Sequence, residues 1–324
     1  MQIPSRRSCH CWRSRMFMYL DCVPCLLRQT LSAVRMAGDD PSVQHEVVRQ
    51  VLHILAETDF TRRTPPDMAQ WTHRLIRELT GQGDPYRHIK QCSNEVALSM
   101  LPALERRIGQ SGDPFAAAVR VALAGNIIDF GANHETDVSL KGIETVVEQA
   151  FAAPLNSLAL ESLRAAASSA ESILYICDNA GEIAFDRLLI EQLGPHKVTA
   201  AVRGGPIIND ATLEDAVAVG LAGLTTVIST GDDLPGVIVS QCNEPFQNIF
   251  HGADLVIAKG QGNFETLSDI PRNIFFLLKA KCTVAAERIG CEQGDYIILE
   301  STRMDDERPQ DAPDPDGTVN HQLL

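Results

Sequence analysis

Apolar residues recur at two different spacings along the chain, and the spacing changes near residue 170. From Met18 to about Ala167 they return every three or four positions, which is the period of an amphipathic helix. Few runs of β-branched residues interrupt this region, so the pattern predicts an all-helical module that we assign to residues 18–168. Its helices are expected at residues 26–34, 47–55, 68–79, 86–101, 114–123 and 140–151.

Beyond this module, short apolar runs alternate with helical segments. Strands are predicted at residues 172–177, 197–202, 225–229, 255–258, 273–279 and 296–299, and helices at residues 182–193, 210–219 and 236–250. Alternation of this kind is typical of a mainly parallel sheet with helices on both faces. The sequence therefore predicts an α/β domain over residues 169–302, preceded by the helical module.

The two ends of the chain fit neither pattern. Residues 1–17 are basic and contain Cys9, Cys11 and Trp12, with no apolar segment behind them. We interpret them as an artefact of the assigned start or as a disordered arm. Residues 303–324 are polar and crowded with Asp, Pro and Gly, so we expect a disordered tail.

Charge and cysteine content limit the classes of partner and the cellular compartment that the protein is expected to have. The 324-residue chain has a formal net charge of −14 and a pI near 5.0, which argues against a nucleic-acid binder with its basic face. No apolar run approaches the roughly 20 residues that span a bilayer, so no membrane partner is expected. Nine cysteines, an odd number without a secretory signal, favour reduced thiols in a cytoplasmic protein.

Polar residues follow almost every predicted strand. Asp178 and Asn179 come directly after the first strand, just before a turn that leads into a helix. Later strands are followed by the segments 203–212, 229–233, 259–265 and 279–282. The carboxyl ends of parallel strands meet at one edge of a sheet, and ligands bind there. We therefore expect these polar groups to converge on one binding site.

Three of these side chains have the chemistry of a metal site. Asp178, Asn179 and Asp210 offer oxygen donors, which favour Mg²⁺ or Mn²⁺ over Zn²⁺. So few protein ligands leave positions for water and phosphate oxygens. Considered alone, Asp210 could equally cap the following helix, as could Asn209. The Asp-Asn pair on the neighbouring strand favours the metal site.

The segment after the fourth predicted strand contains the parts of a phosphate cradle. Lys259 supplies a cation, and Asn263 adds a carboxamide. Gly260 and Gly262 would let backbone N–H groups approach an anion closely. The segment is neither a Walker loop nor a dinucleotide-binding GxGxxG motif. Lys281 adds a second cation, or is a solvated surface lysine.

Two polar segments of the helical module are open to more than one interpretation. Asn126 and Asp129 lie one helical turn apart between glycines, so they either reach the substrate or cap an interhelical loop. Residues 84–94 form a turn followed by a polar helix, which we interpret mainly as a surface helix.

Cys22 and Cys25 form a CxxC motif near the start of the module, with no second CxxC at zinc-finger spacing. They are a thiol pair, half of a metal site completed by a distant cysteine such as Cys92, or two buried apolar residues. A structural role is favoured.

Seven short motifs follow one another across residues 18–301. They are Asp-Cys-Val-Pro-Cys-Leu-Leu-Arg-Gln at 21–29, Asp-Pro-Tyr…Lys…Ser-Asn at 84–94, Gly-Asn-Ile-Ile-Asp-Phe-Gly at 125–131, Asp-Asn-Ala-Gly-Glu at 178–182, Asn-Asp-Ala-Thr at 209–212, Lys-Gly-Gln-Gly-Asn-Phe-Glu at 259–265 and Lys-Ala-Lys-Cys at 279–282. Together they resemble the domain-of-unknown-function-89 family of metal-dependent damage-control phosphatases, and its CxxC-bearing microbial branch most closely.

The resemblance implies a Rossmann-like α/β domain packed on the helical region, and phosphatase activity on small phosphate monoesters such as sugar phosphates or damaged phosphometabolites. It implies a divalent metal, Mn, Mg, Co or Ni, at the three oxygen-donor side chains named above. It places residues 259–263 and Lys281 beside the phosphate, and we count Glu182 with the substrate-binding residues. In the eukaryotic branch this acid comes one residue later, and an Arg-Thr-x-Lys signature replaces Lys-Ala-Lys-Cys.

Catalysis in this scheme depends on offsetting the charge of the transferring phosphoryl group with the metal and the lysines. The attacking group is either water or Asp178. Because a metal-binding Asp178 is poorly placed to attack, water is preferred. Two other functions remain open: a nucleotide- or S-adenosylmethionine-dependent transferase with Asp232 or Asp233 on a ribose, and a non-enzymatic thiol or metal-binding scaffold organised by Cys22 and Cys25.

Overall fold

The computed structural model describes residues 16–125, 145, 148–149, 151–152 and 154–301. Asn126, Asp129 and the predicted tail at 303–324 lie outside these residues. Within the predicted helix at 140–151, every described residue is helical. The predicted leader, residues 1–17, lies outside except for its last two residues. There Met16 is buried and its N–H donates to Asp269, so the disorder expected for the leader does not extend to this residue.

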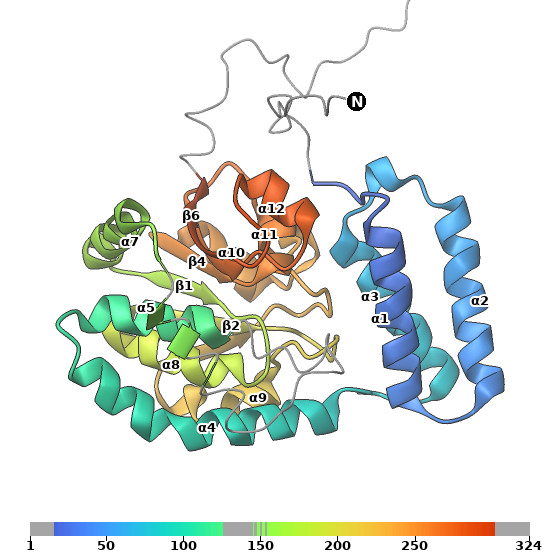
Figure 1. Ribbon diagram of the computed structural model, residues 1–324, viewed down its shortest axis with the longest axis horizontal. Coiled ribbons are helices and arrows are strands. Elements are labelled where there is room, and N and C mark those ends of the chain that lie inside the picture. The colour runs from blue at the N-terminus through green and yellow to red at the C-terminus, as the bar shows by residue number, and fades with distance from the viewer. Residues whose placement is uncertain (1–15, 126–144, 146–147, 150, 153, 302–324) are drawn as a thin grey trace, which may run out of the picture.

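The first three helices form a bundle beside the sheet (Figure 1). They are α1 (Cys22–Ala37), α2 (Pro41–Glu57) and α3 (Pro65–Thr80). Asp40 caps α2, a capping box between Thr64 and Asp67 begins α3, and a proline occupies the first helical turn of each. The apolar stripes meet in one core whose members include Leu26, Val34, Val47, Val51, Met68, Ile76 and Tyr86.

The next helices pack on the sheet instead. They are α4 (Arg87–Gly109), α5 (Pro114–Gly125) and α7 (Ser157–Ser169), and their apolar residues share a core with the strands. Helix α4 runs from beside the α1–α3 bundle along the lower side of the molecule to α5 (Figure 1). Side-chain packing therefore groups α4, α5 and α7 with the sheet, and the predicted division at residue 168 stays a prediction.

A six-stranded sheet forms the centre of the α/β part. Its strands are β1 (Ile173–Ile176), β2 (Val198–Val202), β3 (Thr226–Ser229), β4 (Leu255–Lys259), β5 (Ile274–Lys279) and β6 (Tyr296–Glu300). Their order is β3-β2-β1-β4-β5-β6, and all neighbours are parallel except β5 and β6. The predicted fold class, a mainly parallel α/β sheet preceded by helices, is confirmed, and each predicted strand matches within one residue at either end.

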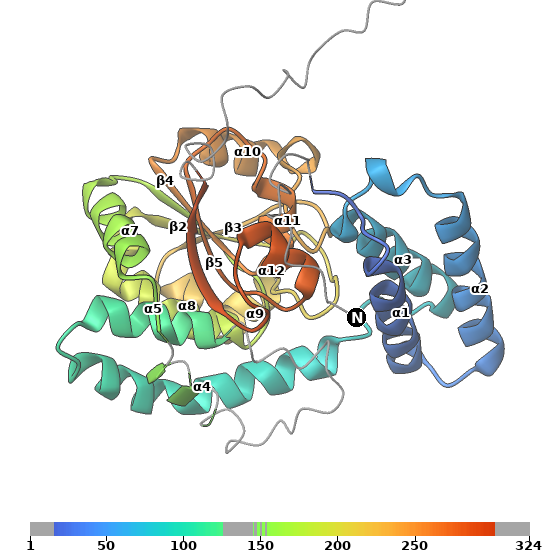
Figure 2. The same cartoon turned by 45° about the horizontal axis from the view of Figure 1, so that its top comes forward.

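Alternate residues of each strand pack on opposite faces of the sheet. Tyr175 belongs to the core shared with α4, α5, α7 and α8 (Glu182–Leu193). Leu174 and Ile176 belong to the core shared with α10 (Glu244–Gly252), α11 (Gln261–Leu267) and α12 (Thr283–Ile289). Figure 2 shows α10, α11 and α12 together near β4 and β5. None of the helices in the described part of the chain is long and apolar enough to cross a membrane.

The helices of this half differ from the prediction in several places. The helix expected at residues 236–250 is instead a short 3-10 turn, Val239–Gln241, followed by α10, which Asn243 caps. The seven-residue helices α11 and α12 were not predicted, because two turns carry too little periodicity to reveal a helix.

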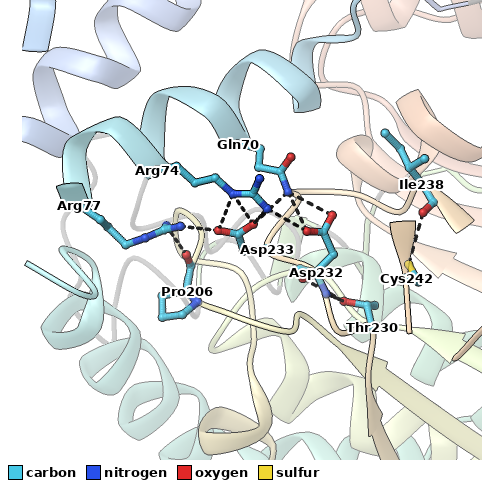
Figure 3. A network of polar contacts seen from close by, with 9 residues as sticks. All are labelled: Gln70, Arg74, Arg77, Pro206, Thr230, Asp232, Asp233, Ile238 and Cys242. Atoms are coloured by element: carbon cyan, nitrogen blue, oxygen red, sulfur yellow. Dashed lines mark hydrogen bonds and ion pairs between the residues drawn. The ribbon is translucent and has the colours of Figure 1, made fainter. Parts of the chain in front are cut away.

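Helix α3 is joined to the loop after β3 by charged side chains (Figure 3). Arg74 contacts both Asp232 and Asp233, and Gln70 Nε2 donates to both carboxylates. Arg77 pairs with Asp233 and also donates to the carbonyl of Pro206, 2.7 Å away. Burial disfavours the charge of Asp233, but the two arginines outweigh it and hold its pKa below the ordinary value. These contacts dock the helical bundle on the sheet edge.

We expect Asp233→Ala to lower the free energy of unfolding by about 1–3 kcal/mol, because it removes a partly buried carboxylate from two arginines. The matched control is Glu214→Ala, which removes the partner of Arg87 from an exposed ion pair and should cause no measurable change. Urea unfolding of both variants measures the difference. Equal effects would show that this interface is not a docking contact.

Candidate metal and phosphate site

The strand order creates a topological switch point between β1 and β4. The chain builds β1, β2 and β3 outward in one direction, then crosses to the other side of β1 and builds β4, β5 and β6. In open α/β sheets the crevice at the carboxyl ends of the strands beside such a point binds ligands. The segments that follow β1, β2 and β4 therefore form the candidate site.

The loops after β1 and β2 are joined through their backbones. Ala211 N–H donates to the carbonyl of Asp178 at 2.8 Å, and Ala180 N–H donates to the carbonyl of Asn209 at 2.9 Å. These bonds make Asn179 and Asp210 partners in an isolated antiparallel bridge. The structure thus brings together the three side chains predicted to be metal ligands.

Asp210 lies before the helix that was expected to contain it. Helix α9 spans Leu213–Ala218, rather than residues 210–219, and Thr212 is its cap residue. Asp215 accepts hydrogen bonds from the N–H and the hydroxyl of Thr212, at 2.9 and 2.8 Å. The alternative that Asp210 or Asn209 caps this helix is wrong.

The side chain of Asp178 is held in a crowded, negatively charged setting. It is 7% exposed, and its Oδ2 accepts from Asn179 Nδ2 at 2.8 Å. Burial raises the pKa of Asp178 well above its ordinary value, and the charges of Asp210 and Glu182 raise it further. Lys281 and Arg203 lower the pKa of the same group without cancelling this effect. A cation at this position would relieve the repulsion.

Arg203 is a site residue that sequence reasoning did not select. It is 1% exposed, and its Nε donates to Asp210 Oδ2 at 2.6 Å. Its Nη1 donates to Gly236 O and Asn263 Oδ1, while Nη2 lies 3.6 Å from Asp178 Oδ1. The guanidinium therefore holds the carboxylate of Asp210 by a hydrogen bond and faces the carboxylate of Asp178 at ion-pair distance. An arginine directly after a buried strand, at the start of the Arg-Gly-Gly-Pro run, was the available signal.

The donor set suits a hard divalent cation. Asn179 Nδ2 is occupied by Asp178 and by Glu182, whose Oε2 lies 3.0 Å away, so the amide oxygen is the atom left to act as a ligand. With carboxylate oxygens from Asp178 and Asp210, this gives the oxygen-only chemistry that Mg²⁺ and Mn²⁺ prefer. Among the described residues there is no group of three His, Cys, Asp or Glu side chains able to hold a metal, so the candidate site depends on the asparagine.

The sequence predicted that Lys259 would be accessible to a phosphate, but the structure places it elsewhere. Its side chain is completely buried. Its Nζ contacts Glu182 Oε1 at 2.6 Å, Asp186 Oδ1 at 2.7 Å and the carbonyl of Ala122 at 2.8 Å. These three contacts use the three N–H donors of an ammonium group. A direct role for Lys259 at the phosphate remains a prediction, while its contact with Glu182 is a feature of the structure.

Two more buried groups complete this cluster. Tyr175 OH donates to Asp186 Oδ1 at 2.7 Å. Burial raises the pKa of Asp186 to about 6, although Lys259 acts in the opposite direction. Burial also disfavours the charge of Lys259, but Asp186 and Glu182 outweigh it and raise the pKa of the ammonium. Asp186 was not predicted, yet an aspartate one turn after Glu182 on an apolar helix was a detectable signal.

The glycines after β4 allow close packing. Gly260 has φ +81°, and a Cβ at this residue would lie 1.9 Å from Asp178 Oδ2. A Cβ at Gly262 would lie 2.1 Å from the carbonyl oxygen of Pro235. Gly260 N–H donates to Leu277 O at 3.1 Å, within the sheet. Asn263 Nδ2 donates to Lys259 O at 2.6 Å. A role for these residues at a phosphate stays a prediction.

Lys281 follows β5 at the same end of the sheet. Its backbone N–H donates to Gln261 Oε1 at 3.0 Å, and its charge lowers the pKa of Asp178 and of Glu265. Burial nevertheless raises the pKa of Glu265 to about 7. Lys281 therefore remains a candidate phosphate ligand on the β5 side.

The CxxC motif lies in the first turn of α1. Burial raises the pKa of the Cys22 thiol to about 11, and Glu265 and Cys282 contribute to the shift. Burial also raises the pKa of Cys25. Thiols with raised pKa values are poor nucleophiles at neutral pH. Cys92, suggested as a distant partner, instead has its sulfur 3.8 Å from a ring nitrogen of His88.

Asp232 and Asp233, which were considered as ribose ligands, contact helix α3 in the structure. Both carboxylates are engaged by Gln70 and Arg74 of α3. This occupancy gives the transferase alternative no support from the described residues.

Comparison with known proteins agrees with this architecture. The profile of the damage-control phosphatase ARMT1-like domain matches residues 18–297. A damage-control phosphatase of Archaeoglobus fulgidus is 35% identical over 286 residues, covering 85% of this chain and 96% of that protein. One from Pyrococcus horikoshii is 35% identical over 283 residues, covering 86% and 96%. The crystal structure of a DUF89 family protein from P. horikoshii aligns with TM-score 0.80 and 34% identity, covering 89% of this chain and all of that one.

The chain belongs to the damage-control phosphatase ARMT1-like family. The family predicted from the seven motifs is thereby confirmed, and the expected enzyme class agrees with the names of these relatives.

Replacing Lys259 should destabilise the fold in a pH-dependent way. Lys259→Met leaves Glu182 and Asp186 buried without their cation, and breaking a buried ion pair in this way costs about 3–5 kcal/mol. Burial raises the pKa of Asp186, so this carboxyl is protonated more readily in the folded state and favours folding at low pH. The loss of unfolding free energy should therefore be greater at pH 8 than at pH 5.5, as measured by urea unfolding.

The matched control is Lys279→Met, a half-buried lysine at the end of the adjacent strand β5. It should cost less and show no comparable dependence on pH. A Lys259→Met protein as stable as the parent at both pH values would contradict the assigned role of the buried ammonium.

Proposed function

We propose that the protein is a divalent-metal-dependent phosphatase that hydrolyses small phosphate monoesters, such as sugar phosphates or damaged phosphometabolites. The observation that carries this proposal is the bridge between Asn179 and Asp210, with Asp178 beside them at the switch point. Family membership supports the reaction class.

The three predicted ligands would hold the cation through oxygen atoms. When bound, the cation would supply Lewis acidity toward a phosphoryl oxygen. Asp178 and Asp210 must then be ionised, and Arg203 contributes to this by lowering the pKa of Asp178 and donating to Asp210. Lys281 would contact the phosphate from the β5 side. Mg²⁺, Mn²⁺, Co²⁺ and Ni²⁺ all accept this kind of ligand set.

Glu182 supports the site through Asn179. Its Oε2 accepts from the amide Nδ2 while its Oε1 is held by Lys259. Asn179 Nδ2 is thus engaged by Asp178 and Glu182, which leaves the amide oxygen as the ligand atom. In our proposal Glu182 and Lys259 therefore position a ligand, and the reacting phosphate meets Lys281 and the cation.

We further propose a cytoplasmic location with a phosphorylated metabolite as the partner. The seven cysteines in the described part of the chain are free thiols, which suits a reducing compartment.

A panel of phosphate monoesters assayed with each of the four divalent ions tests the function. We expect turnover that requires the metal and is abolished by a chelator. Asp178→Asn should reduce the rate by roughly 100-fold or more, because it removes an anionic metal ligand. Asp39→Asn, an exposed residue in the linker between α1 and α2, is the matched control and should leave the rate unchanged.

Folded parent protein that hydrolyses no monoester with any of the four ions would refute the proposed function. Equal activity in the two aspartate variants would refute the assignment of the site.

A further inference from the structure

One polar face of α4 is buried against the candidate metal site. The sequence pattern at residues 84–94 predicted mainly a surface helix, and the structure contradicts this for Lys90, Ser93 and Asn94, which are 4%, 2% and 4% exposed. The reason is that α4 packs against both α8 and α9, the helices that follow β1 and β2. A Cβ at Gly181 would lie only 3.0 Å from the Cβ of Ser93.

Asn94 contacts the segments that carry the predicted ligands on both strands. Its Oδ1 accepts from Gly181 N–H at 2.7 Å, in the turn that begins at Asp178. Its Nδ2 donates to Asp215 Oδ1 at 2.9 Å. The other oxygen of Asp215 accepts from the N–H of Thr212 at 2.9 Å, two residues after Asp210. A continuous path of hydrogen bonds therefore links the two loops through one carboxamide.

Lys90 supplies the counter-charge for this path. Its Nζ lies 2.9 Å from Asp84 Oδ2 and 3.3 Å from Asp215 Oδ2. Burial disfavours the ammonium, but Asp215 and Asp84 outweigh it and raise its pKa. The buried Asp215 is thus compensated, and its two oxygens serve as acceptors for α4 and for the start of α9.

The loop that carries Asp210 also contains a strained residue. Ile208 has φ +44°, which is rare for a β-branched side chain and strains the backbone. Its side chain packs against the core of the α1–α3 bundle. Strain of this kind persists only where surrounding contacts hold the loop. The loop is therefore constrained by the helical bundle on one side and by α4 on the other.

We propose that Asn94 is a positioning residue for the metal site: by tying Gly181 to Asp215 it sets the separation of Asp178 and Asp210. The inference rests on the proposed function, since it concerns the same site. Asn94 acts through the two loops and touches neither cation nor substrate. Its removal should weaken metal binding first and catalysis as a consequence.

Asn94→Asp is the direct test. The new carboxylate can still accept from Gly181 N–H, but it faces Asp215 without a donor between them. We expect the dissociation constant for Mn²⁺, measured by titration calorimetry on protein shown to be folded by circular dichroism, to rise at least tenfold. Glu95→Gln, on the adjacent exposed position of α4, should leave it unchanged. If Asn94→Asp does not fold, Asn94→Ala gives the same measurement.

The double variant Asn94→Asp with Asp215→Asn separates positioning from a general loss of stability. In this variant the amide at residue 215 can donate to the carboxylate at residue 94, which reverses the direction of the hydrogen bond in the parent. The total charge is unchanged. We expect it to recover Mn²⁺ affinity to within about threefold of the parent, because the hydrogen bond that ties the two loops together is re-formed. A purely structural role predicts instead that folded Asn94→Asp keeps the Mn²⁺ affinity of the parent, so that the second substitution recovers nothing.

The outcomes distinguish this inference from the proposed function. If the parent binds Mn²⁺ but hydrolyses no monoester, the proposed function is refuted. The Mn²⁺ affinity of Asn94→Asp then still decides the positioning role. Unchanged Mn²⁺ affinity in folded Asn94→Asp, with monoester hydrolysis intact in the parent, would overturn the positioning role alone. Failure of the parent to bind any of the four divalent ions would overturn both.

Discussion

The buried ammonium of Lys259 is the interaction on which the site depends. It joins the end of β4 to Glu182 and Asp186 of α8 and to the carbonyl of Ala122 on α5. Two carboxylates in an apolar core would otherwise be too costly to ionise. The lysine holds one oxygen of Glu182, and the other oxygen accepts from the amide of Asn179. The core of the fold and the orientation of a candidate metal ligand are thus coupled through one charge.

A second constraint acts on the loops from outside the sheet. Helix α4 reaches the turns after β1 and β2 through Asn94, and α3 reaches the loop after β3 through Arg74 and Arg77. The helices that precede the sheet therefore also hold the loops at the carboxyl ends of the strands. It contacts each of the first three strand ends, and the strain at Ile208 is maintained between these contacts.

Much of this arrangement could be predicted because it follows from periodicity. Six apolar runs mark the six strands, and parallel strands must bring Asp178 and Asp210 to one edge. What could not be predicted depends on pairs distant in sequence. Lys259 and Asp186 are 73 residues apart, and Asn94 and Asp215 are 121 apart. From sequence alone, a polar helix face is predicted to face solvent, because the element that packs against it is not known. The need for glycine at residue 260 likewise follows only from the close approach of Asp178 in the folded structure.

The most direct measurement of the central claim is a crystal structure with Mn²⁺, recorded for its anomalous signal. The account predicts a peak between the side-chain oxygens of Asp178, Asn179 and Asp210, at the carboxyl ends of β1 and β2. A peak at Cys22 and Cys25 instead, with none between these oxygens, would contradict it and would favour a metal-binding scaffold over a phosphatase.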